Sequence, residues 1–301
     1  MILVFGGNGQ LGRELTRTSA ARQIPMTALS HAQADIADPA AVRAAFASQR
    51  PSLVVNAAGY TKVDLAETEL EAALQGNELG PAILGEACAA AGVPLLHIST
   101  DYVFDGRKLD AYVEGDAVAP INVYGRSKAA GERAVRAATA HHLIVRTSWV
   151  YGEFGHNFLK TMLRLAMTRE ELRVVDDQRG CPTSTRDLAD AILRIAPRLI
   201  ARDEVWGTYH FAGSGVTTFH GFASRIVAAQ APITGVKPRV TAITSAEFPT
   251  PARRPANSEL DCSLFVRTFG FGGRPWTEET DAITALLAAE LGETGKTSHV
   301  A

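Results

Sequence analysis

Ile2-Leu3-Val4-Phe5-Gly6-Gly7-Asn8-Gly9-Gln10-Leu11-Gly12 joins a short apolar run to a turn of closely spaced glycines. An amphipathic stretch follows at about 10–20, so the pattern predicts a strand, a glycine-rich turn and a helix. Glycines in such a turn let backbone N–H groups approach a pyrophosphate at the helix N-terminus. A turn without function is the alternative, but the flanking strand and helix favour dinucleotide binding. The residues expected to contact the dinucleotide are Gly6, Gly9, Gln10 and Leu11.

Short apolar runs continue to alternate with amphipathic stretches after this unit. Such alternation predicts βαβ units, and therefore an α/β fold with a Rossmann-type doubly wound parallel sheet. Ligands of these sheets bind at the carboxyl ends of the strands. Further strands are expected at 24–29, 53–56, 93–99 and 143–147, and helices at 39–50, before Gly92 and at 122–138. Four acidic residues are interpreted as a helix start with its solvated face: Asp64, Glu67, Glu69 and Glu71.

The second half of the chain has a looser pattern, which predicts a smaller, discontinuous C-terminal substrate lobe. We assign residues 1–150 to the dinucleotide-binding domain, with pieces at about 171–212 that complete its sheet. Residues 151–170 and 213–291 are assigned to the substrate lobe, and the polar residues 292–301 to a flexible tail. The Pro-rich segment 248–255 predicts a loop.

The composition narrows the class of protein and its partners. The 301 residues carry a net charge of −2 without a basic run, which disfavours nucleic acid and anionic membranes as partners. No apolar run reaches the roughly 20 residues that span a bilayer. Cys88, Cys181 and Cys262 lie far apart, so they suggest neither a disulfide framework nor a zinc site. We therefore expect a cytoplasmic chain without a targeting segment.

The ends of two predicted strands carry further candidates for the dinucleotide site. Ala57 and Ala58 follow the third strand, where small side chains let a cofactor lie against the backbone, and Tyr60 comes shortly after. Ser99 ends the fourth strand and Thr100 places a hydroxyl beside it. We expect Ala57, Ala58, Tyr60 and Ser99 to contact the cofactor.

The second predicted strand bears on the choice of dinucleotide. It ends at Leu29-Ser30-His31 without the carboxylate that would bind a ribose 2′-hydroxyl and repel a 2′-phosphate. This absence favours NADPH, with NADH also accepted. Asp35 and Ile36 are placed to meet the adenine, although Asp35 is equally suited to capping a loop.

Tyr124 and Lys128 lie four residues apart in a predicted helix, so both side chains leave one face. A nearby ammonium stabilises a phenolate and lowers a pKa that starts near about 10. The tyrosine could then donate and accept protons near neutral pH. This spacing is common on helix surfaces, so the pair indicates catalysis only with a redox cofactor beside it.

A series of sequence blocks resembles the extended short-chain dehydrogenase/reductases. After the glycine-rich start come N-A-A-x-x-T, S-T-D-Y-V-F-D-G, N-V-Y-G-x-S-K, R-T-S-W-V-Y-G and R-R-P-x-N-S. Within that superfamily the blocks are similar to those of the dTDP-4-dehydrorhamnose reductase family, from Met1 to about Leu291. The resemblance implies NAD(P)H-dependent reduction of the C4 ketone of dTDP-4-dehydro-β-L-rhamnose to dTDP-β-L-rhamnose, the last step of dTDP-rhamnose biosynthesis.

The resemblance also implies roles for individual residues. Tyr124 would protonate the developing alkoxide, and Lys128 would lower its pKa and bind the nicotinamide ribose. Thr100 would donate to the substrate oxygen as its charge grows. Asp101, the residue after Thr100, is also expected to contact the substrate.

Three other residues are candidates for substrate binding, but each could instead have a purely structural role. Trp149 packs on the sugar by similarity, but a large aromatic is more often part of a core. Asn157 either meets the nucleotide sugar or caps the helix that follows it. Arg254 is chosen over Arg253 as the diphosphate ligand because a guanidinium suits phosphate oxygens, a solvated loop pair being the alternative.

A metal site is the one feature of the resembled family that we do not expect. Some members dimerise around Mg²⁺ held by glutamates, and Glu14 and Glu290 match two such positions. Arg186 stands where a further glutamate is expected, and an arginine there would repel the cation. Asp187 is the alternative ligand. We expect no metal ion and leave homodimer formation open.

Two other functions stay open at the level of sequence. A non-catalytic dinucleotide-binding regulatory subunit, like the relative that partners methionine adenosyltransferase, would turn over no nucleotide sugar. A reductase, epimerase or dehydratase of another nucleotide sugar would share the fold. A 4,6-dehydratase is expected to carry T-D-E, and Tyr102 interrupts that order here, which disfavours dehydration.

Overall fold

The computed structural model describes residues 1–297, with the backbone alone for residues 292–297. At its centre lies a six-stranded sheet in the order β10-β5-β4-β3-β1-β2. All neighbouring strands of this sheet pair in parallel. The strands are β1 (Ile2–Phe5), β2 (Met26–Leu29), β3 (Leu53–Asn56), β4 (Leu95–Thr100), β5 (His142–Thr147) and β10 (Gly207–His210). The predicted Rossmann-type parallel sheet is thereby confirmed.

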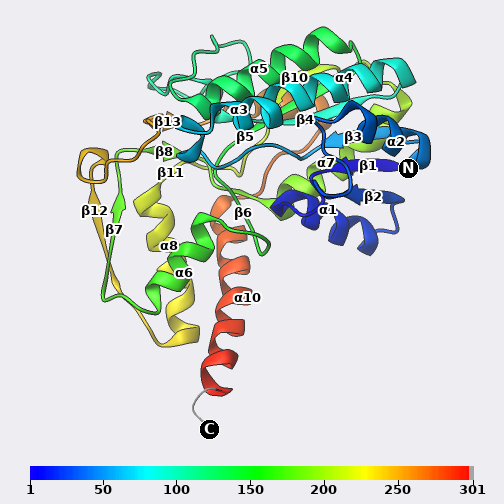
Figure 1. Ribbon diagram of the computed structural model, residues 1–301. Coiled ribbons are helices and arrows are strands. Elements are labelled where there is room, and N and C mark those ends of the chain that lie inside the picture. Colours follow the sequence, from blue (N-terminus) through cyan, green and yellow to red (C-terminus); the bar gives the residue numbers. More distant parts are fainter. Residues whose placement is uncertain (298–301) are drawn as a thin grey trace.

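Helices cover both faces of the sheet, as Figure 1 shows. They are α1 (Gln10–Ala21) and α7 (Thr185–Ala201) on one face, and α2 (Pro39–Gln49), α4 (Gly80–Ala91) and α5 (Val123–Ala138) on the other. Successive strand residues serve opposite faces: Ile2 and Val4 pack with α1 and α7, whereas Leu3 and Phe5 pack with α2, α4 and α5. Because both faces are apolar cores, polar ligands approach at the carboxyl ends of the strands.

The connection between β3 and α4 contains more structure than the sequence predicted. It consists of η1 (Leu65–Glu67), α3 (Leu70–Leu74) and η2 (Gln75–Leu79), and η2 is a π-helical turn that runs directly into α4. A π-helical turn is uncommon and is found frequently at functional sites. It turns Asn77 inward, where the side chain has no exposed surface.

A second core lies apart from the sheet and corresponds to the predicted substrate lobe. It packs α6 (Phe158–Ala166), α8 (Phe219–Thr234) and α10 (Trp276–Thr297) against β7 (Glu171–Val175). The strand β12 (Arg239–Ile243) pairs in parallel with β7. Of the pieces at about 171–212 that were predicted to complete the central sheet, β7 belongs to the lobe instead, because it buries Leu172 and Val174 against the lobe helices. The strand β10 and the helix α7 do belong with the central sheet.

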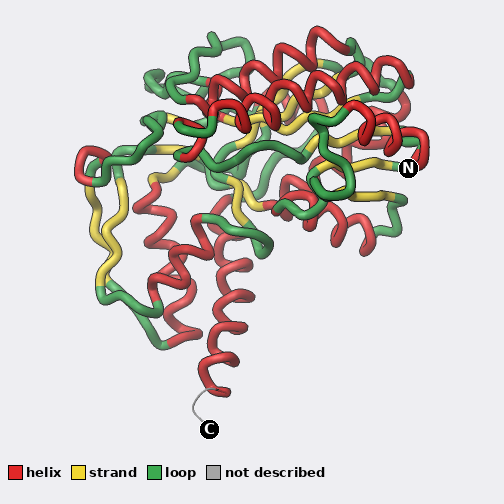
Figure 2. The backbone as a smooth tube through the Cα atoms, in the orientation of Figure 1, coloured by secondary structure: helices red, strands yellow, loops and turns green. Residues whose placement is uncertain are grey.

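Loops and short strands join the two parts, as Figure 2 shows. The short strands are β6 (Val150–Tyr151), β8 (Arg179–Gly180), β9 (Thr183–Ser184), β11 (Thr217–Thr218) and β13 (Asn257–Ser258). The remaining short helices are η3 (Asp101–Val103), η4 (Ser245–Glu247) and α9 (Ser263–Phe269), and α9 packs Phe265 into the core of the central sheet. The segment 248–255 is a loop, as predicted. The helix α10 continues to Thr297, and residues 298–301 of the predicted tail lie outside the described residues. Between residues 1 and 297, no helix has the length and apolar character needed to cross a membrane.

Candidate active site

The turn after β1 forms a backbone cradle beside the end of β3. Gly6 has a φ of +91°, and a Cβ built there would lie 2.6 Å from the backbone of Ala57. The N-cap of α1 is Gly9, which has no side chain to bond the first N–H groups of the helix. These donors are free to bind an anion at the positive end of the helix. The side chain of Leu11 packs into the core, so only the backbone of this residue can contact a ligand.

The end of β2 presents an imidazole and no carboxylate of its own. His31 is 85% exposed at its side chain, and its Nε2 lies 3.4 Å from Oδ2 of Asp35. Oδ1 of Asp35 accepts a hydrogen bond from Ala37 N at 2.9 Å, which is the loop-capping alternative. Ile36 is buried and packs against Gly80. Contact of Asp35 and Ile36 with adenine therefore remains a proposal.

Tyr124 and Thr100 meet at the carboxyl end of β4. Asn122 caps α5 by accepting from Gly125 N at 2.7 Å, and this places Tyr124 in the first turn of the helix. Burial raises the pKa of Tyr124 to about 12, while a hydrogen bond with Thr100 lowers it and the nearby charge of Asp101 raises it. Its phenol therefore stays protonated near neutral pH.

Lys128 lies one turn further along α5 and is 6% exposed. Its Nζ donates to Ile98 O at 2.6 Å. Burial lowers the pKa of Lys128 to about 8, and the charge of Glu132 opposes this shift. The expected lowering of the Tyr124 pKa does not occur in this arrangement, because desolvation of the phenol outweighs the effects that favour its ionisation.

Ser99 belongs to a buried ionic network that the sequence did not reveal. Its Oγ donates to Glu132 Oε1 at 2.6 Å, and Arg146 donates to both oxygens of Glu132 at 2.8 and 2.7 Å. Burial opposes ionisation of Glu132, but Arg146 outweighs it and lowers the carboxyl pKa to about 2. In sequence, Glu132 and Arg136 look like an ordinary helical surface pair. The network connects the predicted cofactor residue Ser99 to the helix of Tyr124.

Asn77 is a second residue that sequence reasoning missed. Its Oδ1 accepts from Tyr60 N at 2.9 Å, and its Nδ2 donates to Tyr60 O at 3.0 Å and to Ser127 Oγ at 2.9 Å. A Cβ at Gly59 would lie 2.8 Å from this Oδ1 and 3.9 Å from Nζ of Lys128. Asn77 therefore ties the segment after β3 to α5, and the π-helical turn places it there.

The acidic residues after β3 lie on an exposed to half-buried face, as the sequence indicates, and three of them also make specific contacts. Asp64 accepts from both terminal nitrogens of Arg254 at 3.1 and 2.8 Å. Glu67 accepts from Val123 N at 2.8 Å, and Glu69 accepts from the hydroxyl of Tyr60 at 2.6 Å. The predicted diphosphate ligand Arg254 is thus already paired. Glu67 thus ties the segment after β3 to the start of α5, and Asp64 ties it to the loop 248–255.

Trp149 has both a core contact and an unusual backbone. Its φ is +47°, which is rare for a bulky residue and signals strain or function. Its ring stacks on Phe219 with centroids 3.7 Å apart. A Cβ at Gly180 would lie 2.6 Å from Cε2 of the indole, so the ring needs a glycine beneath it. Trp149 is thus part of the lobe packing while staying partly exposed.

Asn157 caps α6, which is the structural alternative stated for it. Its Oδ1 accepts from Lys160 N at 3.0 Å, and its Nδ2 donates to Gly152 O at 2.8 Å. The same Nδ2 donates to Gln10 Oε1 at 2.9 Å. A predicted substrate residue and a predicted cofactor residue are therefore in direct contact. Its contact with the nucleotide sugar stays a proposal.

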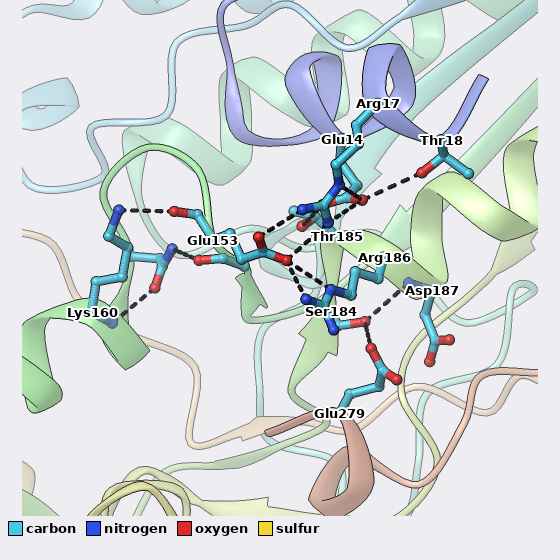
Figure 3. A network of polar contacts seen from close by, with 12 residues as sticks. Glu14, Arg17, Thr18, Glu153, Lys160, Ser184, Thr185, Arg186, Asp187 and Glu279 are labelled. Carbon is cyan, nitrogen blue, oxygen red and sulfur yellow. Dashed lines mark hydrogen bonds and ion pairs between the residues drawn. The ribbon is translucent and has the colours of Figure 1, made fainter. Parts of the chain in front are cut away.

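Glu14 lies in a network of ion pairs, shown in Figure 3. Arg17 bridges Glu14 at 2.7 Å and Glu153 at 2.6 Å. Arg186 binds the same Glu153, with its Nε 2.8 Å from Oε1. Asp187 is paired with Arg274. Within residues 1–291, no group of three His, Cys, Asp or Glu side chains is arranged to hold a metal ion.

The parallel sheet, the glycine cradle and the Tyr124–Lys128 helix at the end of β4 define an extended short-chain dehydrogenase/reductase. Residues 1–288 match the family described as RmlD substrate binding domain. A dTDP-4-dehydrorhamnose reductase of Sinorhizobium fredii is 43% identical over 291 residues, which cover 96% of this chain and 98% of the relative. The chain therefore belongs to the dTDP-4-dehydrorhamnose reductase family.

Solved structures agree with this assignment. A dTDP-4-dehydrorhamnose reductase from Clostridium acetobutylicum superposes with a TM-score of 0.88 at 38% identity, covering 95% of this chain and 99% of the other. The dTDP-4-dehydrorhamnose reductase from Bacillus anthracis, solved in complex with NADP, gives a TM-score of 0.85 at 36% identity, covering 94% and 97%.

Proposed function

We propose that this chain uses NAD(P)H to reduce the C4 ketone of dTDP-4-dehydro-β-L-rhamnose to dTDP-β-L-rhamnose. The observation that carries the proposal is the meeting of Tyr124, Thr100 and Lys128 at the carboxyl end of β4. The cradle reaches this point through the end of β3, because Gly6 packs on Ala57 and Gly59 lies beside Lys128. Family membership supports the choice of substrate.

The residues present fit a dinucleotide. At Gly6 a Cβ would collide with the backbone of Ala57, so glycine lets the turn lie against the end of β3, and the first N–H groups of α1 have no side-chain cap. The bound dinucleotide supplies the hydride for the carbonyl carbon. The residues proposed to hold it are Gly6, Gly9, Gln10, Leu11, Asp35, Ile36, Ala57, Ala58, Tyr60, Ser99, Tyr124 and Lys128. NADPH is supported by the carboxylate-free end of β2 and by the NADP complex of the Bacillus anthracis relative, with NADH as a second dinucleotide.

Proton transfer is assigned to Tyr124. Its raised pKa keeps the phenol protonated, so it can give its proton to the alkoxide that forms at C4. Lys128 is an ammonium below about pH 8 and favours the phenolate left behind. Thr100 would donate to the C4 oxygen while its charge grows.

The nucleotide sugar is proposed to bind between the sheet and the lobe. Trp149 would pack on the sugar, with Asp101 and Asn157 as further contacts. Arg254 would bind the diphosphate and exchange Asp64 for phosphate oxygens, since a planar guanidinium binds either anion bidentately. We also propose that the protein forms a homodimer, that it lies in the cytoplasm and that it acts without Mg²⁺.

The decisive experiment measures dinucleotide oxidation with dTDP-4-dehydro-β-L-rhamnose, comparing NADPH with NADH. Tyr124→Phe is expected to lower kcat by about 10²–10⁴, the range typical of general acid catalysis, and to leave dinucleotide binding intact. Tyr209→Phe, which removes a phenol hydroxyl from the edge strand β10, is the matched control and should retain turnover. Full activity of Tyr124→Phe would contradict the mechanism. Dinucleotide binding without turnover of any nucleotide sugar, with co-purification of a synthetase, would instead favour the regulatory-subunit function.

A further inference from the structure

Asp101 is a buried acid directly beside the proposed catalytic threonine. It is 3% exposed and begins η3, the turn that leaves β4. Its Oδ1 accepts from Thr100 Oγ1 at 2.9 Å. Its Oδ2 is buried and makes no well-formed hydrogen bond in the part of the chain that the structure describes, although the hydroxyl of Ser258 lies near enough to lower the pKa of the carboxyl. A buried carboxylate with an unpaired oxygen is costly when ionised, so this setting favours the neutral acid.

The surroundings of Asp101 support the same conclusion. The side chains that face it are Tyr102 of η3, Tyr124 of α5, Ser258 of β13 and Cys181. None of these four side chains carries a positive charge; the charges of Arg254 and Asp64 act on Tyr102. Burial raises the pKa of Asp101 to about 6, although the hydroxyls of Ser258 and Thr100 lower it. The acid therefore titrates close to neutral pH.

The hydroxyl of Thr100 has one hydrogen and two lone pairs. One lone pair accepts from Tyr102 N at 3.2 Å. When Asp101 is ionised, the single hydrogen of Thr100 must go to Oδ1, and Thr100 can then only accept from Tyr124. When Asp101 is protonated, it can donate to Thr100 instead. The hydrogen of Thr100 is then free to point into the site, and the phenol of Tyr124 no longer has to donate to Thr100.

We propose that Asp101 is a positioning residue whose protonation state decides whether Thr100 donates to the C4 oxygen of the substrate or only accepts. This inference rests on the proposed function. Reduction builds negative charge on that oxygen, so it needs Thr100 as a donor and therefore the neutral Asp101. Oxidation of the C4 alcohol, in the reverse direction, suits the ionised form. Asp101 keeps its own proton throughout, and the substrate proton still comes from Tyr124.

The test is the pH profile of kcat for ketone reduction in the wild type, Asp101→Asn and Asp101→Ala. The wild type should lose about tenfold in kcat per pH unit above about 6, as the neutral acid disappears. Asp101→Asn carries an N–H that donates to Thr100 at every pH, so this fall should vanish and only the loss near pH 8 from Lys128 remain. Asp101→Ala cannot orient Thr100 and should lose about 10²-fold or more at all pH values. Asp105→Asn changes an acid in the same loop that binds Tyr112, and it should keep the wild-type profile.

Two outcomes would overturn the inference while leaving the proposed function intact. One is an Asp101→Asn profile that keeps the fall near pH 6, and the other is an Asp101→Ala variant indistinguishable from Asp101→Asn. A measurement without turnover separates the two proposals further: ¹³C NMR titration of the aspartate carboxyls, with the Asp101 signal assigned by its loss in Asp101→Asn. A midpoint near 6 supports the inference, whereas a midpoint near the ordinary value of 3.8 refutes it. Absence of wild-type turnover would refute the proposed function alone.

Discussion

Glu132 lies on a helix whose sequence suggests solvent, yet its replacement by glutamine is expected to destabilise the fold strongly. The side chain is 0% exposed and accepts from Ser99 Oγ at 2.6 Å and from Arg146 at 2.8 and 2.7 Å. Arg146 is itself 2% exposed, so Glu132→Gln leaves a buried guanidinium without its counter-charge. Removing one partner of a buried ion pair costs about 3–5 kcal/mol in free energy of unfolding.

The shifted pKa of Glu132 gives a similar free energy for this interaction. Its decrease from 4.5 to about 2 corresponds to about 3 kcal/mol, since each pKa unit is worth about 1.4 kcal/mol. Because the carboxyl pKa is depressed in the folded protein, this stabilisation is present above pH 4.5 and is lost as the pH falls towards 2. Glu132→Gln should therefore lack this part of the acid dependence of stability.

Urea unfolding of the full chain tests this magnitude. Arg136→Met is the matched control, because Arg136 binds the same carboxylate at 2.8 Å but is 36% exposed at its side chain. Exposed pairs contribute about 0–1 kcal/mol, so this variant should stay close to the wild type. A joint change of Glu132 and Arg146 to leucine should recover much of the loss, since no charge is then buried alone. Equal unfolding free energies for Glu132→Gln and Arg136→Met would refute the reasoning.

Three other predictions concern the site itself. The fall of turnover with pH should become steeper above about 8, where the Lys128 ammonium loses its proton, and the residual activity of Lys128→Arg should lack this second, steeper part. Arg254→Ala should raise the KM for the nucleotide sugar by about 10-fold or more, the scale of a lost charged hydrogen bond, without changing the KM for the dinucleotide. Gly6→Ala should abolish dinucleotide binding in a fluorescence titration, because the added methyl would lie 2.6 Å from the backbone of Ala57.

The prediction for Arg254 has a matched control in the neighbouring residue. Arg253→Ala removes the neighbouring guanidinium, whose residue contributes only its backbone oxygen to Asn122, and it should leave both KM values unchanged. An equal rise in the sugar KM for both arginine variants would show that bulk charge, not the fork of Arg254, binds the diphosphate. A steepening near pH 8 that persists in Lys128→Arg would assign that second titration to another group. Tight dinucleotide binding by Gly6→Ala would show that the cradle moves to accept a side chain.

Most elements that carry the site could be predicted because short-range chemistry sets them. Asp38 caps α2, Asn122 caps α5, and Gly92 ends α4 with a φ of +62°, all through contacts within a few residues. The strand near residues 171–175 shows the limit of such patterns. Its apolar alternation predicts a strand but does not say which strand it pairs with, and β7 joins β12 in the lobe.

In the candidate site, too, some residues could be predicted from the sequence and others could not. The positions of Tyr124 and Lys128 on one helix face follow from helical spacing, and the cradle follows from the placement of its glycines. Asn77 could not be found from sequence, because an asparagine in an apparently regular helix gives no sign of the π-helical turn that turns it inward. Likewise, the alternation of charges around Glu132 is the same for a surface helix and a buried one.

The sequence by itself determined the parallel α/β sheet, the dinucleotide cradle and the reductase family, since strand, turn and helix signals act over neighbouring residues. Only the tertiary structure decided the charge state and partners of the polar side chains around the site. Arg254 meets Asp64 across 190 residues, and Arg17 meets Glu153 across 136. Burial and ion pairing depend on which segments the fold brings together, and so does the pKa of Tyr124. For that reason the helix spacing located the tyrosine, but the packing around it determined its proton affinity.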